Sequence, residues 1–387
     1  MPFGLSSVRI RGFRSARDVS FAPGGLCAFV GEARAGKSTL LTALWTLLEP
    51  QAPPPETTDL AHGSDGPIRI EAVESSGRRL RVDARNGALP VLFLPASLRS
   101  GDVIAPVVPA GEAARRAAQL LAAGDETAES DAAPAVALVR GLENCCTSGI
   151  SGLVLLIEEP ELFLRPQAQR YFYRLLRTFV AGGNQAFYST HSPAFLNVAR
   201  LEELALVEHD PETGTTVVQP QALPADESFR AFGEFDAERS ELLLSRAALL
   251  VEGLTEKLVF PFVFRALGHD ADREEISIVE CGGKPNIALF ARVCAATGIP
   301  YVIVHDRDAP AGREPIPSEL AVNALIAELA GPERTVVLEP DFEAVAGLKG
   351  HRHKPERAWR VFSSLDREQV PEQLARAAEL VLSFARR

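Results

Sequence analysis

The sequence predicts an α/β protein of two domains, each built around a mainly parallel sheet. Short apolar strands alternate with helical segments from residue 5 to residue 190, and a second alternating set begins at residue 247. Alternation of this kind places successive strands side by side in a parallel sheet. The chain has 387 residues, which is more than one domain usually needs. An acidic stretch after Phe232 separates the two sets, so we place the domain boundary near residue 240.

Each element follows from its residue pattern. Alternating apolar and polar residues at 8–13 and the apolar run 26–31 predict two strands between residues 5 and 30, and the periodicity of 39–48 predicts a helix directly after them. Residues 68–85 predict a β-hairpin that turns at Ser75-Ser76-Gly77. The remaining elements of the first set are strands at 91–95, 153–157 and 185–190, two short helices in the Ala-rich stretch 101–147, and a helix at 169–180. The second set has strands at 247–253, 276–280, 301–306 and 335–340.

Composition excludes several classes of protein. The longest apolar run, 153–157, is too short to cross a bilayer, and residues 1–20 lack the apolar core of a signal peptide, so we expect a cytoplasmic protein with no membrane segment. The five cysteines form no C-x-x-C pair, which argues against a structural metal or a disulfide framework. A net charge of -11 argues against a protein that coats nucleic acid by bulk electrostatics. Any contact with DNA has to be local.

Lysine is rare in this chain. Only five of the 40 basic residues are lysines, namely Lys37, Lys257, Lys284, Lys349 and Lys354. Where arginine is used almost everywhere, a retained lysine marks a place where a compact ammonium fits and a planar guanidinium does not.

The stretch GEARAGKSTL at 31–40 matches the phosphate-loop pattern G-x-x-x-x-G-K-[ST]. It follows a predicted strand and opens a predicted helix, so backbone amides from Gly31 to Gly36 and on to Thr39 would surround nucleotide phosphates. Lys37 would neutralise the β- and γ-phosphates, and Ser38 would hold Mg²⁺. The pattern predicts an ATP site.

Two further strands of the first set end in polar residues. LVLLIEEPELFLRP places Glu158 and Glu159 at the end of one strand, and STHSP places His191 at the end of the next. In phosphate-loop enzymes a carboxylate at such a strand end holds Mg²⁺, and an adjacent glutamate can orient the attacking water. His191 would sense the γ-phosphate. A solvated acidic turn and an ordinary histidine are the alternatives.

Three acidic groups follow strands of the second set. Glu252 ends one strand and Glu256 comes four residues later, on the same side if a helix starts there. Asp306 and Asp308 end another strand, two residues apart and so on one face. VVLEPDFEA adds Glu339, Asp341 and Glu343. Hard carboxylate oxygens suit Mg²⁺ or Mn²⁺, although acidic turns after strands are also common.

The order of the pieces in the first half is similar to that of the ABC-type ATPases of the RecF, SMC and OLD (overcoming lysogenization defect) group, and LLIEEPELFLRP with STHSP resembles the OLD branch. The resemblance implies an ABC-type P-loop ATPase domain over residues 1–240 with a reduced insert at 101–147. It gives Glu158 the metal role and Glu159 the role of catalytic base, and it implies a homodimer through the ATPase heads.

The chain departs from that group in three places. Ala33 stands where the family usually has Asn, residues 130–138 contain no Ser-Gly-rich signature turn, and no Gln for a Q-loop occurs at 86–100. We therefore expect ATP binding, with hydrolysis weak or absent.

In the second half, VEGLTEK and DRD resemble the glutamate and D-x-D motifs of the Toprim domain of topoisomerases, primases and OLD nucleases, and ECGGKPN at 280–286 resembles the OLD-type segment between them. The resemblance implies a smaller, Rossmann-like Toprim domain over residues 245–387 that holds two metal ions. The implied ligands are Glu252, Glu256, Asp306, Asp308 and Glu343, with Glu339 as the rival of Glu343.

A basic run, KGHRHKPERAW at 349–359, comes last. Its HKPERA resembles a stretch of OLD nucleases in which a lysine, here Lys354, steadies the charged transition state. The alternative is a solvated helix start.

The chain is thus identified as a member of the OLD-like group: a metal-dependent DNA endonuclease or nickase controlled by ATP binding. The family implies a role in phage defence or DNA repair, with partner proteins of such a system. Two alternatives stay open. One is a nucleotide-gated DNA-binding or scaffold protein with vestigial catalysis, and the other is a RecF-like repair ATPase without nuclease activity.

Overall fold

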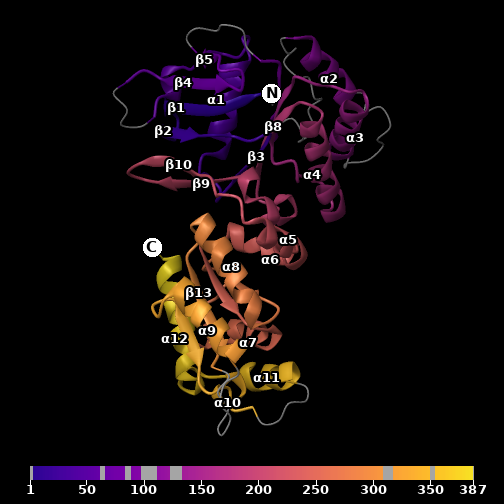
Figure 1. Ribbon diagram of the computed structural model, residues 1–387. Helices are drawn as coiled ribbons and strands as arrows, with labels where there is room; N and C mark the ends of the chain where they lie inside the picture. The colour runs from indigo at the N-terminus through magenta and orange to yellow at the C-terminus, as the bar shows by residue number, and fades with distance from the viewer. Residues whose placement is uncertain are drawn as a thin grey trace. The chain divides into compact units, whose positions relative to one another are not determined.

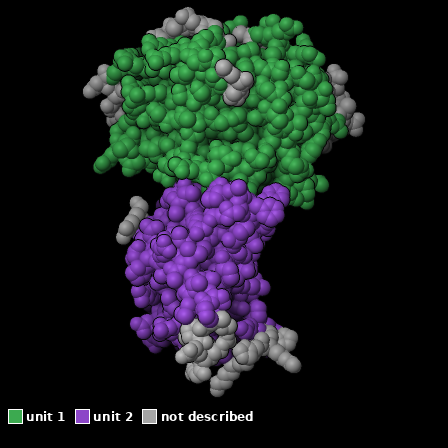
Figure 2. Space-filling view, viewed as in Figure 1, with its two compact units in different colours: residues 1–222 green, residues 223–387 purple. Residues whose placement is uncertain are grey.

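The computed structural model describes residues 3–61, 66–82, 89–96, 111–122, 133–307, 317–348 and 354–386. Its contacts divide the chain into two compact units, residues 1–222 and 223–387, which Figure 2 colours separately. Within the described ranges, no helix has the length and apolar character needed to cross a membrane.

The first unit contains two sheets. A four-stranded antiparallel sheet has the order β2-β1-β4-β5, and a six-stranded sheet has the order β10-β9-β3-β8-β7-β6, parallel throughout except for the β9–β10 pair. Figure 1 labels these strands except β6 and β7. The strands are β1 (Leu5–Phe13), β2 (Ala16–Phe21), β3 (Leu26–Val30), β4 (Arg69–Glu74), β5 (Arg79–Arg81), β6 (Val91–Leu94), β7 (Val154–Glu158), β8 (Gln185–Thr190), β9 (Leu204–Asp210) and β10 (Gly214–Val218). The helices are α1 (Lys37–Leu48), η1 (Thr57–Asp59), α2 (Glu112–Ala122), α3 (Ala133–Thr147), α4 (Pro166–Ala181), η3 (Pro193–Phe195) and η4 (Val198–Glu203).

Helix α1 lies between the two sheets of this unit. One buried cluster joins Ile10 of the antiparallel sheet, Leu41 and Leu44 of α1, and Phe29 and Phe187 of the six-stranded sheet. Burial of this apolar surface fixes the amino end of α1 at the carboxyl end of β3. On the other face α4 packs against β3 and β8, and α3 packs against α4.

The second unit is a four-stranded parallel sheet with the order β12-β11-β13-β14. Helices α7 and α12 pack in one cluster with the sheet, whereas α8 and α9 pack against each other, with α8 on β11 and β13. The strands are β11 (Ala247–Val251), β12 (Ile276–Glu280), β13 (Tyr301–Asp306) and β14 (Thr335–Leu338). The helices are α5 (Ala225–Glu234), α6 (Ala237–Ser240), η5 (Glu241–Leu244), α7 (Leu254–Ala266), α8 (Lys284–Thr297), α9 (Pro317–Ala330), α10 (Phe342–Val345), α11 (Lys354–Phe362), η6 (Arg367–Gln369) and α12 (Glu372–Ala385).

The strand order makes β11 and β13 the point at which the connections reverse direction, since β12 lies on one side of β11 and β13 on the other. In open parallel sheets of this kind, ligands bind in the crevice beyond the carboxyl ends of the strands at that point. The predicted acids at Glu252 and Asp306 stand at these two strand ends. The α/β fold expected from the sequence, with a Rossmann-like second domain, is confirmed.

The second unit begins at residue 223, ahead of the boundary near 240 that composition indicated. Residues 223–245 belong to it because they pack on α8. The ring of Phe235 stacks on that of Phe290 at 4.4 Å, and the Glu227 carboxylate pairs with the Arg292 guanidinium.

Candidate active sites

The phosphate loop connects the end of β3 to the start of α1. Lys37 is 6% exposed, and its ammonium donates to the carbonyl oxygens of Gly31 and Glu32 at 2.8 and 2.7 Å. A Cβ at Gly31 would lie 2.0 Å from the Val207 carbonyl oxygen, and one at Gly36, where φ is +111°, would lie 2.2 Å from Thr215 Oγ1. Both ends of the loop therefore require glycine. Their backbone amides and the amino end of α1 form a setting suited to phosphate.

The other predicted residues of this site lie along the same edge. The sheet order is β3-β8-β7. The phosphate loop follows β3, and His191 follows β8. Glu158 is the last residue of β7, and Glu159 is the next residue. Glu158 Oε2 accepts a hydrogen bond from the Ala96 amide at 3.1 Å. Glu159 Oε1 lies 3.8 Å from His191 Nε2. Ser38 is exposed at the start of α1, whereas the Thr39 hydroxyl is buried and accepts a hydrogen bond from Ser15 Oγ at 3.2 Å.

Charges couple these residues. Burial lowers the pKa of Lys37 to about 8, while the carboxylates of Glu159, Glu161 and Glu32 act to raise it. Burial and the Lys37 charge lower the pKa of His191, against the opposing effect of Glu159. A phosphate entering here would meet an ammonium bounded by acids, a setting that Mg²⁺ would complete.

Sequence reasoning gave no role to Glu161, two residues beyond Glu159. Its Oε1 accepts hydrogen bonds from Thr190 Oγ1 at 3.0 Å and from the His191 amide at 2.6 Å. Its Oε2 is buried and has no hydrogen-bond partner in the part of the chain that the structure describes. Burial raises its pKa. The carboxylate thus ties the segment after β7 to the segment after β8. The available signal in the sequence was that Glu161 is the third glutamate of the segment EEPE at 158–161.

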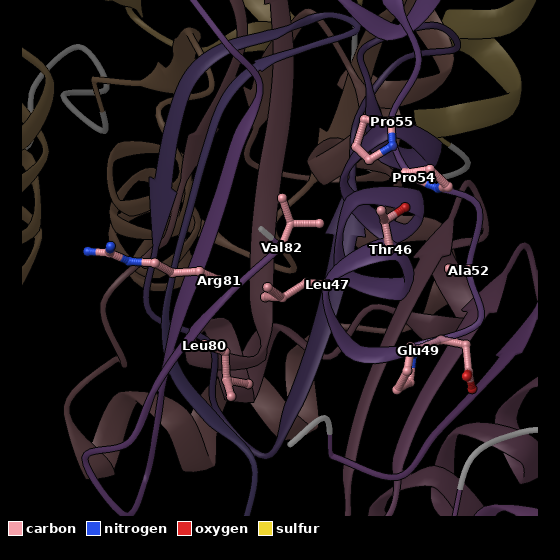
Figure 3. Close-up of a pocket in the computed structure, with 10 residues that line it drawn as sticks. Thr46, Leu47, Glu49, Ala52, Pro54, Pro55, Leu80, Arg81 and Val82 are labelled. Atoms are coloured by element: carbon pink, nitrogen blue, oxygen red, sulfur yellow. The ribbon is translucent and has the colours of Figure 1, made fainter. Parts of the chain in front are cut away.

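A cavity of about 30 Å³ lies elsewhere in this unit, at the carboxyl end of α1 (Figure 3). Thr46, Leu47 and Leu80 are among the residues that line it. The cavity is large enough for a water molecule but too small for a nucleotide. Because it lies at the far end of α1 from Lys37, it is not part of the phosphate-loop site.

In the second unit, acids from separate segments gather at the carboxyl end of the sheet. Glu256, in the first turn of α7, is 8% exposed, and its pKa is raised to about 7, chiefly by burial and further by the charges of Asp306 and Glu343. Asp306, the last residue of β13, accepts a hydrogen bond from the Phe342 amide at 2.8 Å through Oδ1. That bond brings the start of α10, and with it Glu343, to the end of β13.

Lys354, the first residue of α11, joins the same cluster. Its ammonium pairs with the Glu343 carboxylate, and this hydrogen bond raises its pKa, with the charges of Glu343, Asp306 and Glu256 adding to the effect. Residues 349–353 of the basic run lie outside the described residues. The Lys354 ammonium therefore lies among acids at the carboxyl ends of β11 and β13, where the strand connections reverse direction. Such a setting is suited to a negatively charged ligand that arrives with metal ions.

The remaining predicted ligands have different positions. Glu252 directly follows β11, and Asp308 lies outside the described residues. Glu339 pairs with Arg307 at 2.7 Å, with both side chains more than half exposed. Glu343, and not Glu339, therefore stands with Glu256.

The donor set fits hard divalent cations. Carboxylate oxygens are the ligands that Mg²⁺ and Mn²⁺ prefer, and the like charges that raise the pKa of Glu256 are charges that a cation would offset. Among the described residues, which exclude Asp308, no group of three acidic, histidine or cysteine side chains stands at metal-binding separation. The cluster has the donor chemistry of a metal site, but its described residues do not stand at metal-binding separation.

Sequence reasoning also gave no site role to Lys284, the first residue of α8. It is 6% exposed, and its ammonium donates to the backbone carbonyl oxygen of Asp306. The scarcity of lysine in this chain was the available signal.

Family models match a segment of each unit. Residues 243–308 match the family model of the overcoming lysogenization defect protein-like TOPRIM domain, and residues 137–197 match that of an AAA domain described as a putative AbiEii toxin of a type IV toxin–antitoxin system. The first matched region contains Glu252, Glu256 and Asp306. The second contains Glu159 and His191.

Two curated relatives are named OLD nucleases. The chain is 36% identical over 252 residues to the OLD nuclease of Thermus scotoductus, covering 60% of this chain and 48% of that protein. It is 30% identical over 165 residues to the Old nuclease of Escherichia phage P2, covering 41% and 28%. The match thus spans about half the length of the first relative and less of the second. Among solved structures, the C-terminal region of the Burkholderia pseudomallei OLD protein is 16% identical, with a TM-score of 0.30, covering 36% of this chain and 98% of that one.

Proposed function

The chain is a relative of the OLD nucleases that carries an ABC-like ATPase domain and an OLD-like Toprim domain, and on this premise we propose that it is a metal-dependent DNA endonuclease controlled by ATP binding. The observation that carries the proposal is the convergence of Glu256, Asp306, Glu343 and Lys354 at the switch point of the second sheet. These groups come from four elements. Chance would not readily bring them together.

The chain's own residues divide the work as follows. Glu252, Glu256, Asp306, Asp308 and Glu343 would hold one or two Mg²⁺ or Mn²⁺ ions. Such ions, when bound, stabilise the attacking and leaving oxygens of a phosphodiester. Lys354 would place its ammonium against the scissile phosphate, where negative charge develops. Reversible pairing with Glu343 keeps it in reach of that position.

In the first unit, Lys37 and the amides of the loop would bind the phosphates of ATP, with Ser38 and Glu158 holding its Mg²⁺. Glu159 would orient water if hydrolysis occurs, and His191, held by Glu161, would respond to the γ-phosphate. We propose that two ATPase heads pair when ATP binds. Light scattering after size exclusion, with and without ATP, measures this, and an unchanged monomer mass in ATP would argue against pairing.

A plasmid assay tests the nuclease proposal. Supercoiled DNA is incubated with the protein and Mg²⁺ or Mn²⁺, with and without ATP, beside Glu256→Ala and Lys37→Ala. We expect metal-dependent nicking by the wild type, no nicking by Glu256→Ala with its ATP binding intact, and nicking without ATP control by Lys37→Ala. Failure of the wild type to nick in either metal would refute the proposal and favour a DNA-binding or ATPase role. Cleavage by Glu256→Ala at the wild-type rate would refute the carboxylate assignment.

A further inference from the structure

The turn between β12 and α8, residues 281–284, reaches both acidic strand ends of the second unit. The sheet order is β12-β11-β13, so a side chain that starts after β12 has to pass the end of β11 to meet β13. Adjacent strands lie about 4.8 Å apart, which puts β13 about 10 Å from β12. A lysine is one of the few side chains long enough to contribute to such a span.

Backbone and side-chain contacts of this turn bind the two ends. The Gly283 amide donates to the carbonyl oxygen of Glu252 at 2.8 Å, and the Lys284 ammonium donates to the carbonyl oxygen of Asp306. Gly283 has a φ of +112°, a conformation that side-chain-bearing residues rarely adopt. The turn is therefore shaped to make both contacts.

Lys284 occupies a position where a cation is otherwise unfavourable. It is the first residue of α8, where the helix dipole disfavours positive charge, and it is buried, where an ammonium loses hydration. Stability alone would select a neutral or acidic residue here. The contact with Asp306 gives a lysine a role at this position.

Asp306 is held from its other side as well. Its Oδ1 accepts from the Phe342 amide at 2.8 Å, and the next residue, Arg307, donates its amide to the Leu338 carbonyl at 3.0 Å. Together with Lys284, these bonds set the direction in which the chain leaves β13. That direction determines where the carboxylate of Asp306 can go.

We propose that Lys284 is a positioning residue for the nuclease reaction: its ammonium ties the end of β13 to the turn after β12 and so sets the separation of Glu252 and Asp306 as metal ligands. The inference rests on the proposed function, since it concerns the same carboxylate site. Lys284 acts through Asp306 and does not touch the DNA. Its ammonium donates to the backbone carbonyl oxygen of Asp306, so we place the role of Lys284 in geometry and not in charge balance.

A positioning role and a charge-balancing role for Lys284 predict opposite changes in metal affinity when the lysine is replaced. Both replacements end one atom short of the lysine nitrogen: Lys284→Met keeps the unbranched apolar stem and removes the donor, and Lys284→Gln keeps a neutral donor that does not reach Asp306. Replacement of residues that orient metal ligands typically costs about 10- to 100-fold in metal affinity or activity. We expect a loss of this size in Mn²⁺ affinity for both variants, whereas loss of a countercharge alone would tighten Mn²⁺ binding.

The experiment is isothermal titration calorimetry with Mn²⁺ on the full chain, without nucleotide. Glu256→Ala identifies which binding belongs to this site. Arg334→Met is the matched control, because it removes a cation from the opposite edge of the same sheet, where the guanidinium lies 5.4 Å from the Tyr301 ring. Plasmid nicking under the same conditions should show a lower kcat for the Lys284 variants at unchanged KM for DNA. Thermal melting shows which of the two Lys284 variants is folded. The Mn²⁺ affinity of either folded variant is enough to test the proposal.

Outcomes for the two proposals are separable. Weaker Mn²⁺ binding by a folded Lys284 variant, with the Arg334 control at the wild-type value, supports the positioning role. Equal or tighter binding overturns it while leaving nicking by the wild type, and hence the proposed function, intact. A wild type that binds Mn²⁺ but does not nick refutes the proposed function, and the calorimetry still decides the role of Lys284. A wild type without Mn²⁺ binding at this site overturns both.

Discussion

Replacing Glu256 with glutamine is expected to stabilise the second unit in the absence of metal, and to do so much more at pH 8 than at pH 5. Glu256 is 8% exposed, and its pKa is raised from 4.5 to about 7, first by burial and then by Asp306 and Glu343. Ionisation of this side chain is therefore harder in the folded protein than in the unfolded chain. Glutamine has a similar shape and does not ionise.

The size of the effect follows from the pKa. Below pH 4.5 the carboxyl is protonated in both states, and the folded protein carries no penalty. As pH rises through 7, the unfolded chain releases its proton first, so stability is lost. The loss amounts to about 1 kcal/mol at pH 5 and about 3 kcal/mol at pH 8, at 1.36 kcal/mol for each pKa unit. Glu256→Gln should gain these amounts relative to the wild type.

Two buried thiols provide the assay. Cys281 and Cys294 are both 0% exposed and lie in the same unit as Glu256. Pulse labelling of these thiols across a urea series in EDTA, read by peptide mass spectrometry, reports the unfolding of this unit alone. A stability difference between variant and wild type that is the same at pH 5 and pH 8 would show that Glu256 does not titrate as argued.

Further predictions concern both sites. Lys37→Ala should weaken ATP binding about 10- to 100-fold, because a charged hydrogen bond to phosphate is lost; fluorescence titration with a labelled nucleotide measures this, and unchanged affinity would contradict the phosphate-loop assignment. Gly31→Ala should lower the melting temperature of the first unit, since its Cβ would lie 2.0 Å from the Val207 carbonyl oxygen; a wild-type melt would show that the loop has another shape. Lys354→Ala should lower kcat for nicking about 100-fold or more without weakening Mn²⁺ binding; full activity would leave Lys354 only its pairing with Glu343.

Local patterns predicted most strands; β2, β9 and β10 were missed, and the omission of β2 has a physical cause. Two strands were expected between residues 5 and 30, whereas the structure has three, because β1 turns back into β2 at Arg14 and Ser15. No glycine or proline marks that turn. Arg14 adopts a φ of +50°. Its backbone amide donates a hydrogen bond to the Asp59 carbonyl oxygen at 2.6 Å, and its Nε donates one to Asp59 Oδ1 at 2.9 Å. A partner 45 residues away stabilises a conformation that no local propensity indicates.

The residues of the candidate sites also fall into two groups: those whose position local patterns predicted, and those whose position depended on a tertiary contact. A phosphate loop has to follow a strand and open a helix, and acids that follow parallel strands have to meet at one edge. Residue type and spacing therefore predicted that Lys37, Glu252, Glu256 and Asp306 lie at or just beyond strand ends, where the structure has them. The choice of Glu343 over Glu339 depended on the Asp306–Phe342 bond, which no spacing reveals.

The sequence by itself determined the fold class and predicted that most acids of the two candidate sites follow strands, because strand and helix periodicity and strand-end chemistry are local properties of the chain. Only the tertiary structure decided the roles of Glu161 and Lys284 and the start of the second unit at residue 223. Each of these depends on a contact between segments distant in sequence. Such contacts arise when buried faces pack, and their partners cannot be identified until the packing is known.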